Sequence, residues 1–480
     1  MHGAPRTVRT DYDAVVVGAG PNGLAAAIAL AQRGWRVLVR EAEDAVGGGA
    51  RSAELTLPGV VHDVCAAVHP LGAGSPFFQT LPLREHGLEW VHPDALLAHP
   101  LDDGSAAVLE RSVDATAAGL GSDGAGYRRL LTPFAEHWTR LAADVLAPLH
   151  WPRHPLLFAR FGLRGLRSAV GLARATFRGE PARALFGGIA AHSGVALDRS
   201  PSASFGLVLT AAGHAAGWPF VGGGSQRLAD ALAAHLRSLG GEIATSAPVT
   251  SVDDLPRARA VVLDLTPRQI LRIAGSRLPK RYRRALARYR YGPGVFKVDW
   301  ALDGPIPWNC PTCLRAGTVH LGGTLDEIVA AERAVAEGRH AERPFVLLGQ
   351  PSLFDRSRAP AGTHVAWAYC HVPNGSVVDM TSRIEEQVER FARGFRERIL
   401  ARHAMSPAEL ERHDANLVGG DISAGAMNLR QLFFRPAVRR VPYATPDKRL
   451  FVCSASTPPG GAVHGMCGYW AATAVLERVS

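Results

Sequence analysis

The sequence is poor in cysteine and lysine and has no long apolar run. Six cysteines among 480 residues are too few for a fold held by disulfides, and they suit a reducing compartment. No apolar stretch approaches the roughly 20 residues that a membrane-spanning helix needs. The first residues, MHGAPRTVRTDYD, lack the apolar segment of a secretory signal. We therefore expect a cytoplasmic protein.

Positive charge is carried almost entirely by arginine. The formal net charge is +10, and the only lysines are Lys280, Lys297 and Lys448. A basic balance favours anionic partners in general but identifies none of them. The segment KRYRRALARYRY interleaves tyrosines with basic residues, as nucleic-acid-binding segments do. It directly precedes an expected strand, so we interpret it as a solvated helix and expect no nucleic-acid partner.

What the sequence does contain is a glycine-rich turn between a strand and a helix. The stretch YDAVVVGAGPNGLAAAIALAQRGWRVLVREAE predicts a buried strand, the turn, a helix and a second strand. These elements are expected at Val15–Val17, Gly18–Gly23, Leu24–Gln32 and Val37–Val39. The order is typical of a dinucleotide-binding unit.

Each residue of this unit has a physical role. The turn around the dinucleotide would consist of Gly18, Gly20, Pro21, Asn22 and Gly23. Gly18 permits the tight turn, Gly20 lets a pyrophosphate reach the helix N-terminus, and Gly23 lets helix and strand pack closely. Glu41, at the end of the second strand, can accept hydrogen bonds from both ribose hydroxyls.

A second glycine cluster favours FAD over NAD. In VGGGARS, backbone N–H groups at Gly48 and Gly49 and the guanidinium of Arg51 could meet a second stretch of the same pyrophosphate. An NAD-binding domain would continue into another βαβ unit, and the following LPGVVHDVCAAVHPLGAGSPFF is not one.

At this point the chain resembles a known family. The pair GAGPNGLAAAIALA and EAEDAVGGGARS resembles the phytoene-dehydrogenase-like FAD oxidoreductases, relatives of carotenoid desaturases and amine-oxidase-type flavoproteins. The stretches FKVDWALDGPIPW, GGDISAGAMNLRQLFFRP and LFVCSASTPPGGAVHGMCGYWAA look like the subgroup named for pyridine nucleotide-disulfide oxidoreductase domain-containing protein 2. The first pair is shared with many flavoproteins, whereas the last three stretches are specific. Together they cover essentially the whole chain.

The resemblance implies an α/β fold in which a discontinuous Rossmann-like FAD-binding domain carries an inserted α+β substrate domain. It assigns residues 11–79, 217–282 and 431–480 to the FAD-binding domain, and residues 80–216 and 283–430 to the substrate-binding domain. In such proteins the C-terminal segment returns to the FAD-binding domain.

The resemblance also implies that PPGGAVHG passes along the flavin and enters a final helix at about Gly468–Arg478. The FAD contacts implied at this end are Gly460, Gly461 and Val463, and the backbone near Val249 would meet the adenine. The stretch SASTPPG departs from the corresponding pattern of carotenoid desaturases. The resemblance therefore supports an FAD contact at this turn more strongly than it supports a carotenoid as the substrate.

Apolar patterns between the two ends predict further elements. The segment 217–252 indicates a turn, a helix and two short strands, and RAVVLDLTP indicates another buried strand. Further strands are expected at Phe296–Leu302, Val319–Gly322, Phe345–Gly349 and His364–Val372. A long helix is expected over Ser382–Arg402.

These features predict an FAD-dependent oxidoreductase that dehydrogenates a C–C bond of a largely apolar substrate by hydride transfer to the flavin. The electron acceptor stays open. Two alternatives also stay open: an amine-oxidase-type flavoprotein acting on a small amine, and a non-catalytic assembly protein that keeps FAD as a structural element. No catalytic base is evident. His464 beside the flavin and His62 in VHDVCAAVHP are the candidates for moving a proton.

Cys310 and Cys313 form a CxxC motif. A zinc site needs two more ligands, and no second CxxC or spaced histidine pair accompanies this one, so we expect no metal. A flavin disulfide reductase would carry its cysteines soon after the second strand, where EAEDAVGGGARSAEL has none. A loop is favoured over a redox dithiol.

The segment 156–178 carries a stripe of arginines. On one continuous helix, these arginines would fall within an arc of about 80°, beside a face of apolar side chains. The arginines are Arg160, Arg164, Arg167, Arg174 and Arg178, and the apolar residues are Leu163, Leu166, Val170 and Phe177. Such a helix could lie peripherally on an anionic membrane, or it could be a solvated helix of the substrate-binding domain.

Overall fold

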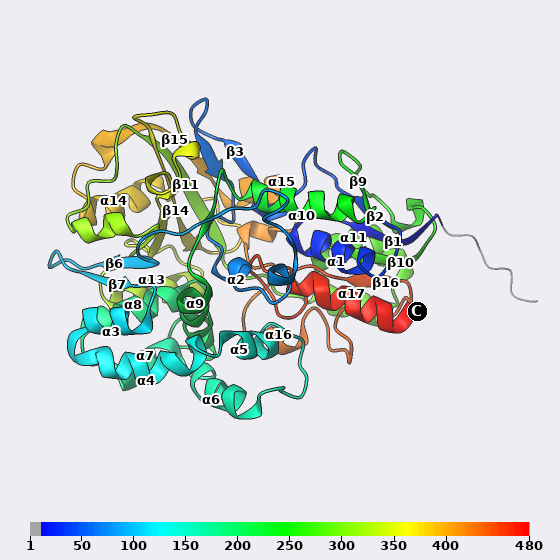
Figure 1. Cartoon of the computed structure of the whole chain (residues 1–480), viewed down its shortest axis with the longest axis horizontal. Helices are drawn as coiled ribbons and strands as arrows, with labels where there is room; N and C mark the ends of the chain where they lie inside the picture. The colour runs from blue at the N-terminus through cyan, green and yellow to red at the C-terminus, as the bar shows by residue number, and fades with distance from the viewer. Residues whose placement is uncertain (1–10, 480) are drawn as a thin grey trace, which may run out of the picture.

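The computed structural model describes residues 11–479 and contains two large β-sheets, one parallel and one mixed (Figure 1). The parallel sheet has the strand order β16-β10-β1-β2-β9. Its strands are β1 (Tyr12–Val17), β2 (Val37–Arg40), β9 (Glu242–Ala244), β10 (Ala258–Leu263) and β16 (Leu450–Val452). Every neighbouring pair runs parallel. Three distant parts of the chain therefore build one sheet, and all of its strands lie within the three segments that the resemblance assigns to the FAD-binding domain.

Helices cover both faces of the parallel sheet. On one face α1 (Pro21–Ala31) packs against α10 (Gln226–Ser238) and α17 (Met466–Val479), which Figure 1 shows running alongside it. A Cβ on Gly23 would lie 2.1 Å from the carbonyl oxygen of Gly18, and a Cβ on Gly468 would lie 1.9 Å from that of Asn22. These two glycines therefore let α1 approach β1 and let α17 approach α1.

The other face of the parallel sheet is covered by α11 (Pro267–Ala274) and α12 (Lys280–Ala287). The segment expected as a solvated helix forms α12. Its basic residues are exposed, and its Tyr282 and Leu286 are buried against this face. This division of polar and apolar residues is that of a helix with one solvated face and one face packed on the sheet.

The mixed sheet has seven strands in the order β15-β11-β14-β13-β12-β6-β7. Its strands are β6 (Leu97–Pro100), β7 (Ala106–Leu109), β11 (Gly294–Leu302), β12 (Thr318–Leu321), β13 (Val346–Gly349), β14 (His364–Val372) and β15 (Ile399–Met405). The strands pair antiparallel except for β6 and β12. Two ribbons join β3 (Ser52–Glu54) to β4 (Val61–Asp63), and β5 (Trp90–Val91) to β8 (Phe220–Val221).

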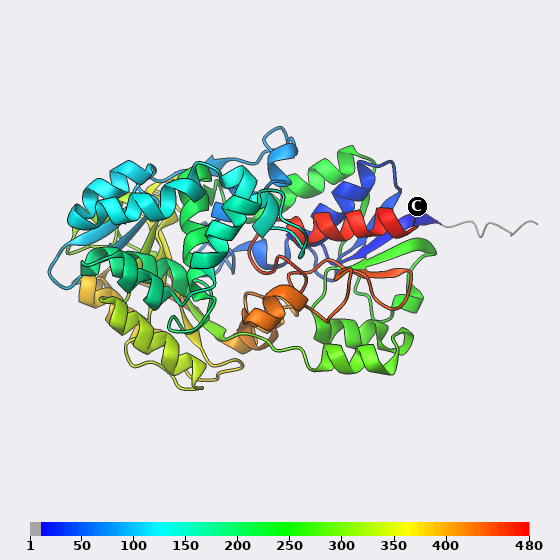
Figure 2. The same ribbon diagram turned by 90° about the horizontal axis from the view of Figure 1, so that it is seen from below.

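A group of helices between residues 113 and 216 packs beside the mixed sheet (Figures 1 and 2). They are α3 (Val113–Gly119), α4 (Gly124–Ala135), α5 (Trp138–Val145), α6 (Pro155–Gly165), α7 (Ala169–Thr176), α8 (Glu180–Ala191) and α9 (Ser202–Ala216). The remaining helices are α2 (Pro70–Ala73), α13 (Leu325–Ala336), α14 (Thr381–Phe391), α15 (Pro407–His413) and α16 (Leu429–Phe434). The core joins α8 and α9 to the buried face of α13.

The expected fold class is confirmed, because a parallel Rossmann-like sheet is combined with a mixed sheet in an α/β arrangement. Within the described residues, no helix has the length and apolarity needed to cross a membrane. Residues 1–10, on which the expectation of a cytoplasmic protein partly rests, lie outside the described residues.

The long helix expected over Ser382–Arg402 is wrong beyond its first half. Helix α14 ends at Phe391, and Ile399–Met405 forms β15 on the edge of the mixed sheet. Gly394 has a φ of +86°, a left-handed conformation that a helix cannot contain. Phe395 then turns into the core of the sheet, where it is completely buried.

The single amphipathic helix expected over 156–178 is also wrong. Helix α6 ends at Gly165, and Ser168 caps a separate helix, α7, by accepting a hydrogen bond from the backbone N–H of Gly171. Leu163 is 79% exposed whereas Phe177 is 1% exposed, so the expected apolar face is divided between solvent and core.

Only one of the two short strands expected at the end of 217–252 forms, namely β9. Pro248 follows it and has no N–H to donate to a strand ladder. The chain here bends into a loop instead, and that loop reaches the candidate site.

Candidate functional site

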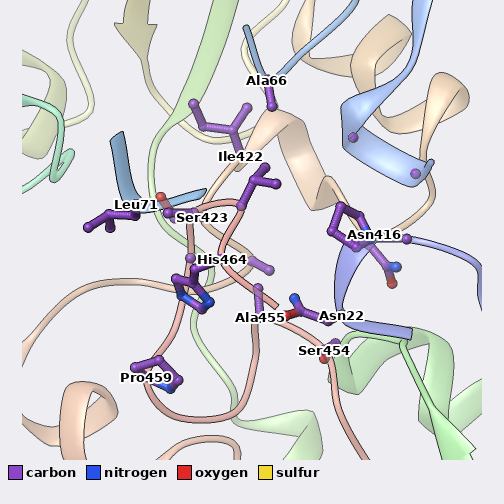
Figure 3. A pocket seen from close by; sticks show the side chains of 18 of the residues that line it. Asn22, Ala66, Leu71, Asn416, Ile422, Ser423, Ser454, Ala455, Pro459 and His464 are labelled. Atoms are coloured by element: carbon purple, nitrogen blue, oxygen red, sulfur yellow. The ribbon is translucent and has the colours of Figure 1, made fainter. Parts of the chain in front are cut away.

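A cavity of about 690 Å³ connects the parallel sheet to the mixed sheet. It is lined by the turn after β1, the end of β2, segments between residues 144 and 218, and the C-terminal segment 454–464. Figure 3 shows Asn22 on one wall, His464 and Pro459 on the C-terminal turn, and Ile422 and Ser423 nearby. Segments far apart in the sequence therefore meet around one space.

Most of the residues predicted to bind FAD line this cavity. They are Gly18, Gly20, Pro21, Asn22, Glu41, Gly48, Gly49, Arg51, Val249, Gly461 and Val463. Gly23 does not line it, since Gly23 is the contact between α1 and β1. Gly460 does not line it either: a Cβ there would lie 2.9 Å from the buried guanidinium of Arg435.

The N-terminus of α1 is open towards the cavity. Gly20 is the N-cap and supplies no side chain, and Pro21 occupies the first turn. A Cβ on Gly48 would lie 3.3 Å from the Cα of Gly20, so the two glycine clusters lie against each other. The side-chain oxygen of Asn22 is buried without a hydrogen-bond partner in the described part of the chain. Exposed backbone N–H groups and the helix dipole make this cradle suitable for a pyrophosphate.

Glu41 holds the end of β2 against the glycine-rich turn. Its Oε2 accepts a 2.6 Å hydrogen bond from the backbone N–H of Ala19, and its Oε1 accepts a 3.1 Å bond from that of Glu43. The carboxylate is 8% exposed and lines the cavity, where it is placed to accept bonds from a ribose.

Arg51 lies beside the second glycine cluster. Its Nε donates to the carbonyl of Gly48 at 3.1 Å, its guanidinium faces Glu43 at 3.4 Å, and it also donates to the carbonyl of His413. These contacts hold a positive charge on the wall of the cavity near the α1 N-terminus.

Two carboxyl groups at this end, the buried Asp264 and the partly buried Asp414, were not predicted. Asp264 follows β10 directly, at the carboxyl edge of the parallel sheet where ligands of such folds bind. It accepts a 2.9 Å hydrogen bond from the backbone N–H of Gly23. Burial raises the pKa of Asp264 to about 8, and the nearby carboxyls of Asp414 and Glu41 act in the same direction. A neutral Asp264 leaves this cradle without an added negative charge that would repel a pyrophosphate.

The C-terminal turn reaches the cavity with backbone rather than with reactive side chains. His464 lines the cavity, but its Nδ1 accepts a 3.0 Å hydrogen bond from the backbone N–H of Met466. Burial lowers the pKa of His464 to about 4, so the ring is neutral at pH 7. His464 therefore fixes the turn that leads into α17.

His62, the other candidate for moving a proton, lies outside the cavity lining. Its ring is completely buried, its Nε2 lies 2.8 Å from the hydroxyl of Thr56, and its Nδ1 lies 3.4 Å from Asp299. Asp299 is in turn paired with the buried Lys297. The structure therefore places His62 in a polar network beneath the cavity.

The other end of the cavity is an apolar chamber. Its walls include Phe158, Phe161, Phe205, Val208, Leu209, Leu347, Ile422, Leu432 and Phe433. The acidic lining residue on this side is Asp144, and its carboxylate accepts hydrogen bonds from His150 and from the backbone N–H groups of Arg153 and His154. The remaining acidic lining residues, Glu41, Glu43, Asp264 and Asp414, lie at the dinucleotide end. Among the described residues, the chamber thus offers no free carboxylate to a cation.

His192 is a polar feature of the chamber that was not predicted. Its Nε2 lies 2.9 Å from the Nε2 of the buried His320, so one imidazole donates to the other. Burial, aided by the charge of His371, lowers the pKa of His192 to about 3. With 19 histidines in the chain, no sequence signal distinguishes this one. A neutral His192 is suited to hydrogen-bonding a polar group of a ligand.

Cys310 and Cys313 are distant from this chemistry. Cys310 directly precedes the short helical turn η6 (Pro311–Arg315), and Cys313 lies within it. The turn packs against the mixed sheet, and neither cysteine lines the cavity. Burial raises the pKa of the Cys313 thiol, which disfavours a reactive thiolate. Among residues 11–479 no group of histidine, cysteine and acidic side chains could hold a metal ion.

The residues present fit FAD. The glycine cradle at the α1 N-terminus, the carboxylate of Glu41 and the guanidinium of Arg51 match a pyrophosphate and a ribose. The cavity continues past the C-terminal turn into the chamber, where a flavin ring would meet a ligand. Glu41, Arg51 and the α1 N-terminus would hold the nucleotide part.

The family model for the NAD(P)-binding Rossmann-like domain matches residues 16–81. A mouse protein, pyridine nucleotide-disulfide oxidoreductase domain-containing protein 2, is 27% identical over 99% of this chain and 95% of its own length. Hydroxyneurosporene desaturase from Rhodobacter capsulatus is 34% identical over 30% of this chain and 34% of its own length.

Two solved structures share the fold. An oxidoreductase from Methanosarcina mazei aligns with a TM-score of 0.65 at 17% identity, covering 97% of this chain and 99% of its own. Wild-type putrescine oxidase bound to putrescine aligns with a TM-score of 0.60 at 18% identity, again covering 97% of this chain and 99% of its own. At these identities the likeness concerns the fold alone.

Proposed function

We propose that this chain, homologous over nearly its full length to pyridine nucleotide-disulfide oxidoreductase domain-containing protein 2, dehydrogenates a carbon–carbon bond of a largely apolar substrate. The homology, the partial match to a desaturase and the fold identify an FAD-dependent oxidoreductase of the amine oxidase and desaturase superfamily. What we propose beyond this is the class of substrate, an apolar molecule that loses hydrogen from a carbon–carbon bond.

The observation that carries the proposal is the continuity of the cavity. One space joins a cradle for a pyrophosphate to an apolar chamber in which residues 11–479 present no free carboxylate. A small diamine would need a counter-charge on entering such a chamber, because burying an unpaired ammonium group is costly. The binding of an apolar chain there would be favoured by about 25 cal/mol for each Å² of apolar surface removed from water.

The side chains have distinct tasks in this proposal. The α1 N-terminus, Glu41 and Arg51 bind the nucleotide part of FAD, which supplies a two-electron acceptor when bound. The phenylalanine and leucine walls exclude water and align the substrate chain. His192 would hydrogen-bond a polar group of the substrate. Its lowered pKa, about 3, makes its imidazole a weak base that would not take up the released proton at pH 7. Dehydrogenation would remove a hydride and a proton from neighbouring carbons of the substrate and leave a carbon–carbon double bond; FAD would supply the acceptor for the hydride, and water could take the proton.

The amine oxidase alternative has one supporting observation. The rings of Trp367 and Tyr369 line the chamber and are nearly parallel, with an interplanar angle of 6° and centroids 6.3 Å apart. Aromatic faces can attract an ammonium group. An amine donor is therefore included in the test.

The test is anaerobic reduction of the purified flavoprotein. Long-chain acyl thioesters, isoprenoids and fatty acids form the apolar panel, and putrescine and a monoamine form the amine panel. We expect loss of the visible flavin absorbance with an apolar donor only, and a product that is lighter by two hydrogen atoms. Bleaching by an amine alone would reverse the assignment of substrate. Bound FAD that neither panel reduces would favour the non-catalytic assembly protein.

A further inference from the structure

Most of the exposed large apolar side chains of the described residues lie on two segments, which we call the rim. The rim comprises residues 149–167, around α6, and residues 429–440, around α16. Trp151 and Leu156 are each 87% exposed, and Leu163 is 79% exposed. The other exposed apolar residues of the rim are Leu149, Leu166, Leu429, Phe433, Phe434 and Val438. A concentration of this kind marks an interaction surface.

The rim surrounds one opening of the cavity. Leu149, Leu166 and Phe433 line the cavity and are also exposed, at 67%, 52% and 36%. Behind them Phe158 and Phe161 belong to the walls of the apolar chamber. Figure 1 places α5, α6 and α16 along the same lower edge of the molecule, and both rim helices face the viewer in Figure 2. Whatever covers the rim therefore covers the entrance to the chamber.

The charge of the rim has one sign. Neither segment contains an aspartate or a glutamate. The arginines that are exposed or partly exposed are Arg153, Arg160, Arg164, Arg167, Arg430, Arg439 and Arg440, whereas Arg435 is completely buried and belongs to the interior. None of these arginines forms an ion pair within residues 11–479. Arginines elsewhere do pair, for example Arg174 with Asp326 at 2.6 Å and Arg333 with Asp198 at 2.7 Å.

We propose that the rim docks the protein on an anionic lipid membrane, with the mouth of the chamber facing the bilayer. Tryptophan and leucine side chains of the rim would enter the headgroup boundary, and the unpaired arginines would contact lipid phosphates. A second copy of the chain fits this surface less well, because two facing rims would bring unpaired arginines together. This surface differs from the arginine stripe that the sequence predicted. Arg174 is paired with Asp326 and Phe177 lies in the core, so neither belongs to it, whereas α16 contributes a second contact.

The experiment is co-sedimentation of the flavin-bound protein with vesicles of phosphatidylcholine alone or with about one third phosphatidylglycerol. We expect binding to the anionic vesicles at low salt and release at high salt, since screening weakens the attraction. Replacing Arg160 and Arg167 by glutamine removes two charges, and each removal should weaken binding about fivefold. Replacing Trp151 and Leu163 by glutamine should weaken it about tenfold or more.

Matched controls lie on the same protein outside the rim. Val377→Gln removes an apolar residue that is 89% exposed, and Arg333→Gln removes an arginine paired with Asp198. Both controls should bind vesicles as the unchanged protein does. All the replaced apolar side chains are exposed, so a retained flavin spectrum verifies the fold of each variant.

Four results would overturn the proposal. The first three are equal binding to neutral and anionic vesicles, equal weakening by control and rim variants, and self-association through the rim, seen as an oligomer that the Trp151 and Leu163 replacements dissociate. Affinity for an acidic protein without affinity for vesicles would also overturn it. The measurement reads binding rather than turnover, so it stands apart from the choice of substrate.

Discussion

Glu41 combines a structural and a binding task at one carboxylate. It already accepts hydrogen bonds from the backbone N–H groups of Ala19 and Glu43, and it lies on the cavity wall, where it could also accept bonds from the ribose of a bound FAD. Such bonds to a charged acceptor contribute about 1.5–3 kcal/mol each.

Replacing Glu41 by alanine should therefore weaken FAD binding about 10- to 100-fold without abolishing it, because the pyrophosphate cradle stays intact. Isothermal titration of the apo-protein with FAD measures the change. Asp44→Ala is the control, as this neighbouring carboxylate is exposed. Unchanged affinity in the Glu41 variant would mean that the ribose lies elsewhere.

Asp264 should make the free energy of unfolding depend on pH, with stability falling as the pH rises. Its folded pKa is raised to about 8, whereas an unfolded aspartate titrates near 3.9. Between these values the unfolded chain has lost the proton that the folded chain retains. The contribution of Asp264 to stability is therefore present below about pH 4 and is lost as the pH rises to about 8, by up to about 1.4 kcal/mol per pH unit.

Asp264→Asn should remove this loss, because the amide oxygen can still accept the hydrogen bond from Gly23. In urea unfolding of the apo-protein, the variant should match the unchanged protein near pH 4.5 and exceed it in free energy of unfolding at pH 8. If the difference between the two proteins is the same at both pH values, Asp264 does not titrate in this window.

At the residue scale, the sequence predicted positions whose role follows from backbone geometry. Gly18, Gly20 and Glu41 lie at fixed spacings around a turn, so their convergence could be foreseen. Asp264, Asp414 and His192 converge on the cavity only through pairing of distant strands and helices. His62 and Gly460 were judged from local motifs, and their neighbours Asp299 and Arg435, which are distant in the sequence from each, hold them outside the cavity.

At the scale of elements, α14 shows how a helical pattern can extend past the end of a helix. Gly394 is left-handed, and a Cβ there would meet only the Glu397 side chain, at 3.9 Å. The cost of a side chain at this position is therefore conformational rather than steric.

Gly394→Ala should lower the free energy of unfolding by about 1 kcal/mol, measured by chemical denaturation of the flavin-bound protein. Gly275→Ala is the matched control: its φ is −59°, and nothing lies within 4 Å of an added Cβ. This control should be neutral or slightly stabilising. An equal effect of both substitutions would show that the backbone at Gly394 does not determine where α14 ends.

Strands rich in apolar and aromatic residues were predicted well, as β14, with the sequence HVAWAYCHV, agrees with the expected His364–Val372. The strand β15 was missed because its sequence, ILARHAM, carries helix-forming residues, and pairing with β11 overrides their preference. Similarly, α6 and α7 read as one helix because Ser168 is compatible with a helix interior until its capping bond is seen.

At the scale of the whole molecule, the cavity has two exposed ends. Pro248, Thr250 and Arg272 line it at the dinucleotide end and are exposed there, whereas the rim surrounds the other end. The nucleotide and an apolar ligand would therefore enter from different sides and would not compete for one passage.

Because FAD would touch segments from all parts of the chain, its binding should stabilise the molecule as a whole. Free FAD at 100 times its dissociation constant adds about 2.7 kcal/mol to the free energy of unfolding. Thermal unfolding of apo-protein with excess FAD should show a raised Tm. Gly20→Val should show no such rise, since its side chain would fill the pyrophosphate cradle, where even a Cβ lies 2.8 Å from Asp264. A rise in the Gly20 variant would contradict the placement of the cofactor.

The parallel sheet also has a consequence for synthesis on the ribosome. Strands β1, β2, β9 and β10 emerge early, but β16 and the turn that closes the cavity follow only after the entire mixed sheet has been made. At roughly 5–20 residues per second, the nascent chain spends many seconds with an incomplete cofactor site and an unpaired edge on β10. Cofactor loading is thus a late maturation step. A chaperone that shields the edge of β10 could bind it only before β16 emerges and pairs with it.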